Sequence, residues 1–260
     1  MRSDLMQLYQ SRDLLRIWTW REIRSRYKQS FLGMAWAILQ PLAMMIVYVI
    51  VFSVIVKVDT GDVPYPLFAY TALLPWTLLA SSLSTGVPSL VTNMSLVTKI
   101  YFPREVLPIS SIMARIVDFF YAGSVMVILL VIYRVPIQWT VVWLPVLFAI
   151  QVVLMIGVVL LGAALNVAYR DVGQLIPLVT QVWMYASPVI YPVSLVPERL
   201  RPLYWLNPMA GIIDGYRLAL LEGRSPDPLG LILATIVSLI LFVAGYLYFK
   251  KVEVVFADII

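Results

Sequence analysis

The stretch MAWAILQPLAMMIVYVIVFSVIV, residues 34–56, contains 23 residues and not one charged side chain. An α-helix rises about 1.5 Å per residue, so a helix of this length reaches across the hydrocarbon core of a bilayer, which is about 30 Å thick. Lipid can surround such a helix because its backbone hydrogen bonds are satisfied within the helix itself. The stretch therefore predicts a transmembrane α-helix.

The rest of the chain has the same character. Hydrophobic residues make up 62% of the 260 residues and charged residues 13%, whereas a soluble domain carries roughly 25% charged residues. We predict an all-α integral membrane protein, a single domain over residues 1–260 with six spans: 34–56, 67–90, 106–133, 139–168, 172–190 and 229–249. The fifth span is the least regular because it contains Pro177 and Pro188, and proline removes a helical hydrogen bond.

The distribution of lysine and arginine predicts which side of the membrane each loop faces. If both chain ends are cytoplasmic, the inside segments hold 12 of the 19 basic residues and the outside segments hold six. The remaining one, Arg115, falls inside the third span. Because basic residues concentrate in cytoplasmic loops, we predict an inner-membrane protein whose N and C termini are cytoplasmic.

Composition also limits the chemistry that this chain can perform. The sequence contains no cysteine and no histidine, which excludes thiolate chemistry, the commonest metal ligand and the usual general base. It lacks the phosphate-binding motif G-x-x-x-x-G-K-[ST], so the chain is not expected to hydrolyse ATP itself. We expect no enzyme activity, no bound cofactor or metal, and no nucleic-acid partner. If transport is driven by ATP, the ATP and magnesium belong to a separate subunit.

Residues 1–33 precede the first span and hold seven basic residues. Within 11–30, apolar and basic side chains alternate at helical spacing: Leu14, Leu15, Trp18, Ile23 and Tyr27 against Arg16, Arg21, Arg24 and Lys28. This pattern favours a basic amphipathic helix that contacts membrane lipids in the cytoplasmic headgroup region. The alternative is a basic anchor with no further role.

Two opposite charges fall within the third span. Arg115 and Asp118 are three residues apart, so they share one face of the helix and are expected to form an intramembrane ion pair. Charges inside a membrane are costly and commonly mark a transport pathway or a gate. The alternative is structural pairing close to the cytoplasmic surface.

Aromatic residues are frequent at the ends of the spans, where they form the usual interfacial belt. Six others are less well explained by that belt and are candidates for a path that contacts sugars: Tyr65, Phe68, Tyr70, Trp183, Tyr185 and Tyr191. Their rings combine a large apolar face with, in Tyr and Trp, a polar group. Ordinary belt or packing roles are the alternative. The external segment 191–228 is too apolar for a solvated loop and is interrupted by prolines, which predicts short re-entrant or interfacial helices.

Six stretches, in order across nearly the whole chain, carry a family resemblance. They are RSRYKQSFLGMAWAILQPL (24–42), ALLPW (72–76), LVTKIYFPREVLPIS (96–110), LNVAYRDVGQLIP (165–177), ASPVIYP (186–192) and LNPMAGIIDGYR (206–217). Each is weak alone, but together they resemble the ABC-2 family of polysaccharide export permeases, which move O-antigen, capsule and teichoic acid chains.

The resemblance implies a homodimer of six-helix subunits, carried by two copies of a P-loop ABC ATPase subunit. The implied cargo is an undecaprenyl-linked polysaccharide, with O-antigen as the first candidate, which passes through a channel between the two permeases. The resemblance also makes 191–228 the periplasmic gate region above that channel.

The same resemblance assigns roles to two cytoplasmic segments. Residues 92–104 would form the coupling helix that docks on the ATPase, with a plain connecting loop as the alternative. Its contact residues would be Lys99, Ile100, Tyr101, Phe102 and Arg104. The helix within 1–33 would lie where the lipid headgroup enters, so that Arg24, Arg26 and Lys28 could meet a pyrophosphate.

Three rival functions remain open on the sequence. An ABC-2 exporter of drugs or haem would bind small apolar cargo and would need no aromatic path. A membrane-bound polyprenyl-phosphate transferase that modifies glycans would need a cluster of acids at one membrane face, and Glu105 and Asp171 are isolated in the sequence. A purely structural assembly subunit is the third alternative.

Overall fold

The computed structural model describes residues 11–28, 32–99 and 102–253. Within these ranges every regular element is a helix, and five helical stretches are long and apolar enough to cross a membrane. They are Gly33–Ile55 (α3, Trp36–Tyr48, extended by η1, Gly33–Ala35, and η2, Val49–Ile55), α4 (Tyr65–Gly86), α7 (Val106–Ile132), Trp139–Ala168 (η3, Trp139–Val142, and α8, Trp143–Ala168) and α12 (Pro228–Glu253). The all-helical, multi-pass prediction is confirmed, and five of the six predicted spans match within a few residues.

The fifth predicted span, 172–190, is not confirmed as a membrane crossing. Its helix, α9, runs from Asp171 to Tyr185 and contains 15 residues. At about 1.5 Å per residue it is about 22 Å long, shorter than the hydrocarbon core. The helix ends ahead of Pro188, because a proline disfavours helical backbone in the residue before it and has no N–H to donate.

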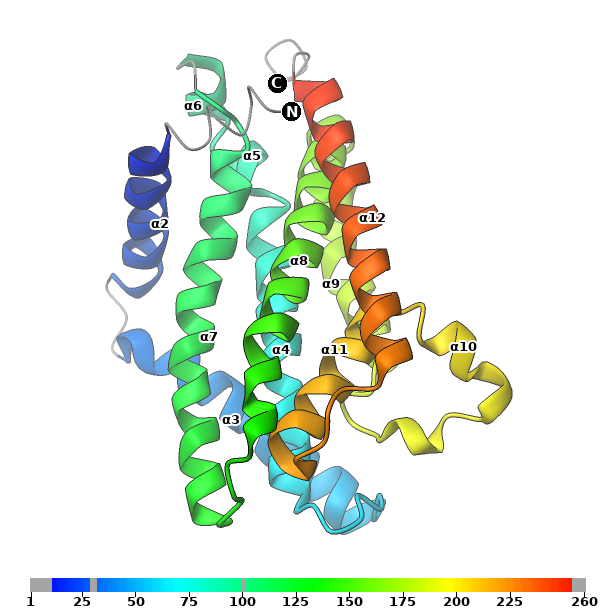
Figure 1. Ribbon diagram of the computed structural model, residues 1–260. Coiled ribbons are helices and arrows are strands. Elements are labelled where there is room, and N and C mark those ends of the chain that lie inside the picture. Colours follow the sequence, from blue (N-terminus) through cyan, green and yellow to red (C-terminus); the bar gives the residue numbers. More distant parts are fainter. Residues whose placement is uncertain (1–10, 29–31, 100–101, 254–260) are drawn as a thin grey trace.

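The segment after α9 forms short helical pieces instead of an extended loop. These pieces are η4 (Val193–Leu195), η5 (Glu198–Leu200), α10 (Arg201–Tyr204), α11 (Pro208–Arg217) and η6 (Leu218–Glu222). In Figure 1 the part around α10 projects to one side, whereas α11 returns to the bundle and lies beside α4, α8 and α12. Asn207 caps α11, because its side chain accepts a hydrogen bond from the backbone N–H of Met209 at 3.1 Å.

The centre of the bundle is α4. Its most apolar window is 78% buried, whereas the corresponding windows of the other four spans are 17–44% buried. Pro75 lies inside α4, and the buried side chain of Gln151 on α8 donates a hydrogen bond to the Pro75 carbonyl oxygen at 2.6 Å. The other spans therefore present much of their apolar surface outward, as helices in lipid do.

Helices α8 and α12 approach each other most closely at two glycines. A Cβ atom at Gly245 would lie 2.1 Å from the Gly157 carbonyl oxygen, and one at Gly157 would lie 2.5 Å from the Phe242 backbone. Small residues at such crossings let two helix backbones pack directly in a membrane. The pair α8–α12 is therefore a closely packed unit at one side of the bundle.

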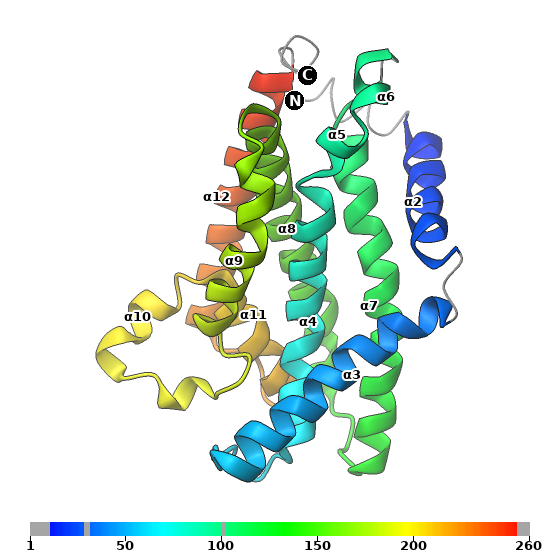
Figure 2. The same cartoon turned by 180° about the vertical axis from the view of Figure 1, so that it is seen from behind.

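The predicted amphipathic helix is present as α2 (Arg12–Tyr27). The predicted apolar face is turned inward: Leu14, Leu15, Trp18, Ile23 and Tyr27 are buried or half-buried, and Arg16, Arg21, Arg24 and Lys28 are exposed. Figures 1 and 2 show α2 running alongside the first half of α7, at the end of the bundle that also carries α5 (Ser89–Thr92) and α6 (Met94–Lys99). The helix therefore packs on a span, a position that its sequence pattern alone did not indicate.

Candidate functional site

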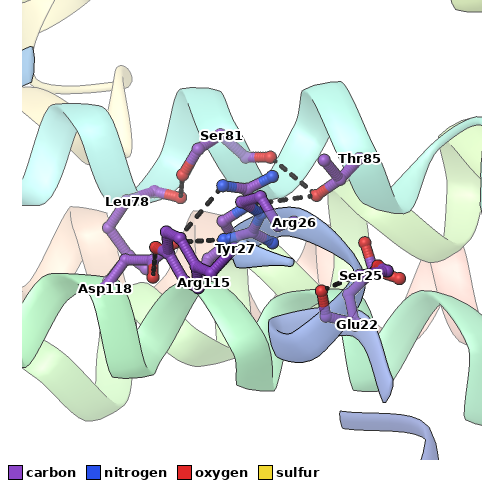
Figure 3. Close-up of polar contacts among 9 residues, drawn as sticks. All are labelled: Glu22, Ser25, Arg26, Tyr27, Leu78, Ser81, Thr85, Arg115 and Asp118. Atoms are coloured by element: carbon purple, nitrogen blue, oxygen red, sulfur yellow. Dashed lines mark hydrogen bonds and ion pairs between the residues drawn. The ribbon is translucent and has the colours of Figure 1, made fainter. Parts of the chain in front are cut away.

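A charged cluster joins α2 to α7. Asp118 on α7 accepts a hydrogen bond from the Tyr27 hydroxyl at its Oδ1 (2.5 Å), and its Oδ2 accepts from Arg26 and, at 3.2 Å, from Arg115. Arg115 also reaches α4, where its Nε donates to Thr85 Oγ1 at 3.4 Å. Figure 3 shows these side chains converging between the three helices. The predicted pair Arg115–Asp118 is thus part of a larger group.

Two arginines bind the same acid in this cluster, and a second acid, Glu22 on α2, acts electrostatically on Arg115. Two guanidinium groups share one carboxylate, and the side chains of Arg26, Arg115 and Asp118 are 22%, 16% and 17% exposed. Arg26 Nη2 is buried and has no hydrogen-bond partner among the described residues. Burial and the neighbouring Asp118 raise the pKa of Tyr27, which keeps its hydroxyl protonated as a donor.

The cluster borders a groove of about 700 Å³. Helices α2, α3, α4, α7 and α9 contribute to its walls, which include all four cluster residues and a set of uncharged polar side chains: Gln40, Thr77, Ser81, Ser84 and Thr180. Thr77 and Ser81 each donate to a carbonyl three residues earlier in α4, so their oxygen atoms remain available as acceptors toward the groove. Asp118 is the thirteenth residue of α7, about 18 Å along the helix, so this polar wall extends deep into the bundle.

The hydroxyl residues of this wall were missed by the sequence analysis. Thr77, Ser81 and Ser84 lie at i, i+4 and i+7 on α4, which places them on one helical face. That spacing was visible in the sequence. The spacing is a weak signal of function, because isolated Ser and Thr residues in apolar helices usually bond to their own backbone.

Five of the six candidate aromatic residues belong to or pack against one hydrophobic cluster, whereas Tyr185 is exposed. Tyr65, Phe68 and Tyr70 are in the core, where the Tyr70 hydroxyl donates to the Ala122 carbonyl at 2.9 Å and that of Tyr65 to the Ile190 carbonyl at 3.1 Å. None of the six lines the groove; its aromatic residues are Tyr27, Trp36, Tyr48, Trp76 and Phe119.

The other three candidates belong to α9 and the segment after it. Trp183 donates to Asn207 Oδ1 at 2.8 Å, the Tyr191 hydroxyl donates to the Tyr185 carbonyl at 2.9 Å, and the Tyr185 side chain is exposed. The bond from Trp183 connects α9 to the start of α11, and the bond from Tyr191 ties the segment after α9 back to its last residue. A contact with cargo stays a prediction for all six residues, of which Tyr185 is the most exposed.

The three basic residues predicted to meet a pyrophosphate are also separated. Arg26 is bound to Asp118, whereas Arg24 and Lys28 are exposed. The Arg24 guanidinium lies 5.8 Å from the Trp20 ring. Of the three, only Arg26 lines the groove.

The predicted coupling segment is attached to the end of α12. Its helical part is α6, Ile100 and Tyr101 lie outside the described residues, and Phe102 packs on an apolar cluster that includes Phe249. Glu105 is 1% exposed and accepts a 2.7 Å bond from Lys250 Nζ. Lys250 also bonds to Glu253 at 2.9 Å, and the Arg104 backbone N–H donates to that same carboxylate at 3.2 Å.

At the opposite end of the bundle, a buried arginine connects α11 to α4. The Arg217 guanidinium donates to the carbonyl oxygens of Val189 (2.9 Å), Phe68 (3.3 Å) and Tyr191 (3.4 Å), and it lies 3.4 Å from the centre of the Phe68 ring. Burial raises the pKa of the neighbouring Asp214 to about 6. Arg217 also lines a second pocket of about 370 Å³, together with Asp59 and Glu222.

Comparisons with known proteins agree with this architecture. The family described as ABC-2 type transporter matches residues 13–221. The chain is 33% identical over 254 residues to the O-antigen export system permease protein RfbA of Myxococcus xanthus, covering 97% of both chains. It is 29% identical over 250 residues to an RfbA of Klebsiella pneumoniae, covering 95% of both, and 23% identical over 239 residues to the polysialic acid transport protein KpsM of Escherichia coli, covering 90% of this chain and 91% of KpsM. The chain therefore belongs to the ABC-2 type transporter family of membrane proteins.

Proposed function

We propose that this chain is the permease subunit of an ATP-driven exporter that moves an undecaprenyl-linked polysaccharide, with O-antigen as the first candidate, from the cytoplasm to the periplasm. The relatives named O-antigen export permease match it over nearly their full length, which supports this class of cargo. The chain itself has no phosphate-binding motif of the P-loop type, so two copies of a separate ATPase subunit supply the energy.

The observation that carries the proposal is the polarity of the groove. Of its 23 lining residues, seven carry a hydroxyl or amide group and three are charged, beside thirteen apolar ones, so a polar strip runs along an otherwise apolar wall. Lipid cannot satisfy these groups, and charges facing hydrocarbon are costly. A groove of this kind suits cargo with many hydroxyls and an anionic linkage better than small apolar cargo.

The open side of the groove argues for a second copy of the chain. Helices α3 and α9 flank the groove and expose large apolar side chains on their outer surfaces, including Ile46, Val47, Leu178 and Val182. In the proposed homodimer the two grooves together enclose a channel, and the remaining apolar surface faces membrane lipids. The count of basic residues supports an inner-membrane orientation with both termini in the cytoplasm.

The bonds between the coupling segment and α12 support a mechanical connection between the ATPase and the membrane helices. A pull on α6 by the ATPase would act on Arg104 and Glu105, and the bonds to Lys250 and Glu253 would carry it into α12. Because α12 packs tightly on α8 at Gly157 and Gly245, both helices would move together. Movement at the ATPase could in this way widen or narrow the channel.

Cells that lack the chromosomal copy of this chain provide the test. Wild-type protein should restore the polysaccharide to the cell surface, measured by surface antibody staining and by gel analysis of the lipid-linked glycan. A variant with Ser81→Leu and Ser84→Leu should retain less than a tenth of wild-type export, because two leucines remove two hydroxyl groups from the groove wall and narrow the groove.

The matched control is Val127→Leu and Val131→Leu, a double change on the exposed surface of α7. Both variants should be present in the membrane at wild-type amounts. Equal export by the groove variant and wild type would contradict the groove as the path, and normal surface glycan in cells without any copy would contradict the export function.

A further inference from the structure

The carboxylate of Asp118 lies where a phosphate could bind to the donors of Arg26, Tyr27 and Arg115. Its two oxygen atoms take bonds from one phenol and two guanidinium groups, supplied by Tyr27, Arg26 and Arg115. Arginine guanidinium and hydroxyl donors are also the groups that bind phosphate most often in proteins. The carboxylate thus holds a set of donors suited to a larger anion.

Two features distinguish this cluster from a plain structural ion pair. Two guanidinium groups share one carboxylate here, and a second acid, Glu22, acts electrostatically on Arg115 but forms no ion pair with it among the described residues. In addition, Arg26 Nη2 is buried and has no hydrogen-bond partner among the described residues. A buried donor without a partner is costly, and a second anionic group would satisfy it.

The cluster is open to a space that can hold such a group. Arg26, Tyr27, Arg115 and Asp118 all line the groove of about 700 Å³, beside Ser81 and Ser84. An anion in the groove can therefore reach the three donors without unfolding any helix. Arg26 and Tyr27 are the last two residues of α2, and Lys28 is its C-cap. A change of partner would therefore also alter how α2 is held on α7.

We propose that Asp118 is a built-in competitor for the phosphate of the cargo. In the empty transporter it holds Arg26, Tyr27 and Arg115; when a lipid-linked pyrophosphate enters the groove, the pyrophosphate takes these donors and the attachment of α2 to α7 is released. This inference rests on the proposed function, because it takes the anionic linkage of the cargo as the ligand. Asp118 thereby lowers the affinity of the site for pyrophosphate, and binding of the cargo is coupled to the attachment of α2 to α7.

The proposal predicts that two variants change the affinity for undecaprenyl pyrophosphate in opposite directions. The complex of permease and ATPase in lipid nanodiscs is titrated with radiolabelled undecaprenyl pyrophosphate. Asp118→Asn removes the competitor and should tighten binding roughly tenfold, and Arg115→Gln removes a donor and should weaken it roughly tenfold, a change of about 1.4 kcal/mol in each direction. If the pair is only structural, both variants should weaken binding.

Controls separate charge, lipid tail and folding. Asp171→Asn removes an exposed acid outside the groove and should leave binding unchanged. Undecaprenol, which lacks phosphate, should bind all variants equally, and inorganic pyrophosphate should compete with the labelled lipid if the headgroup alone is recognised. Size-exclusion profiles and thermal midpoints check that each variant is folded.

A second variant decides the question if Asp118→Asn does not fold. Tyr27→Phe removes one donor without changing charge and should weaken binding several-fold; unchanged binding would overturn the proposal, as would weaker binding by Asp118→Asn. If the chain does not export a lipid-linked glycan, the binding assay should give a result that differs from both outcomes above. In that case wild-type protein binds undecaprenol and undecaprenyl pyrophosphate equally and exports no glycan.

Discussion

The bond between Glu105 and Lys250 allows a quantitative prediction about the cytoplasmic end of the bundle. Glu105 is 1% exposed and its Oε1 lies 2.7 Å from Lys250 Nζ, whereas Lys250 is 21% exposed. Removing one partner of a buried ion pair costs about 3–5 kcal/mol, because the other charge stays buried without compensation. Partial exposure of Lys250 lowers this value, so Lys250→Met should destabilise the protein by roughly 2–3 kcal/mol.

The double variant Glu105→Gln and Lys250→Met removes both charges and should regain at least half of the loss. Thermal unfolding in nanodiscs measures both effects, and the single variant should unfold roughly 5–10 °C below wild type. Lys251→Met is the matched control, because Lys251 is exposed and next in sequence. Equal midpoints for Lys250→Met and wild type, or no recovery in the double variant, would refute the reasoning.

The pH dependence of the stability of Lys250→Met tests whether the buried Glu105 carboxylate causes the loss. Burial raises the pKa of Glu105 above its ordinary value of 4.5, and without Lys250 the carboxyl loses the bond that opposes this rise. The folded state then binds more protons than the unfolded state between pH 4.5 and the raised pKa. Stability of the variant should therefore increase as the pH falls from 8 toward 5, and a midpoint gap to wild type that stays constant would contradict this.

Three further predictions concern packing and access. Gly245→Leu should prevent assembly of the α8–α12 unit and reduce the amount of folded protein several-fold, whereas Gly123→Leu, with nothing within 4 Å of its Cβ position, should not; fluorescence-detected size exclusion compares them. Arg217→Met should lower the unfolding midpoint more than Arg217→Lys, because lysine retains a charge for the carbonyl oxygens, and equal midpoints would count against that role. Arg24→Gln with Lys28→Gln should reduce cargo-stimulated ATPase activity, and unchanged activity would favour a simple anchor.

The spans were predictable because hydropathy belongs to a continuous stretch of sequence. Residues 34–56 contain no charged side chain and few polar ones, and the corresponding helix runs from Gly33 to Ile55. The end of α9 was not predictable from the same signal, since the residues on both sides of Pro188 are equally apolar. There the backbone requirements of one proline outweigh the hydropathy of the stretch.

The amphipathic face of α2 was also visible in the sequence, but its partner was not. The bond from Tyr27 to Asp118 joins residues 91 positions apart. No local sequence pattern predicts a contact over such a separation. The aromatic candidates illustrate the same difficulty. Tyr70 in the core and Tyr185 on the surface are the same residue type in similar apolar stretches, so only the packing of the helices distinguishes them.

Transport by the purified proteins tests the central claim most directly. The permease and its ATPase are reconstituted in liposomes, undecaprenyl-linked glycan is supplied on the ATPase side, and glycan in the lumen is counted after external glycan has been digested. The account predicts lumenal glycan that requires ATP hydrolysis and disappears with Ser81→Leu and Ser84→Leu. Lumenal glycan that is independent of ATP, or equal amounts with the groove variant, would contradict it.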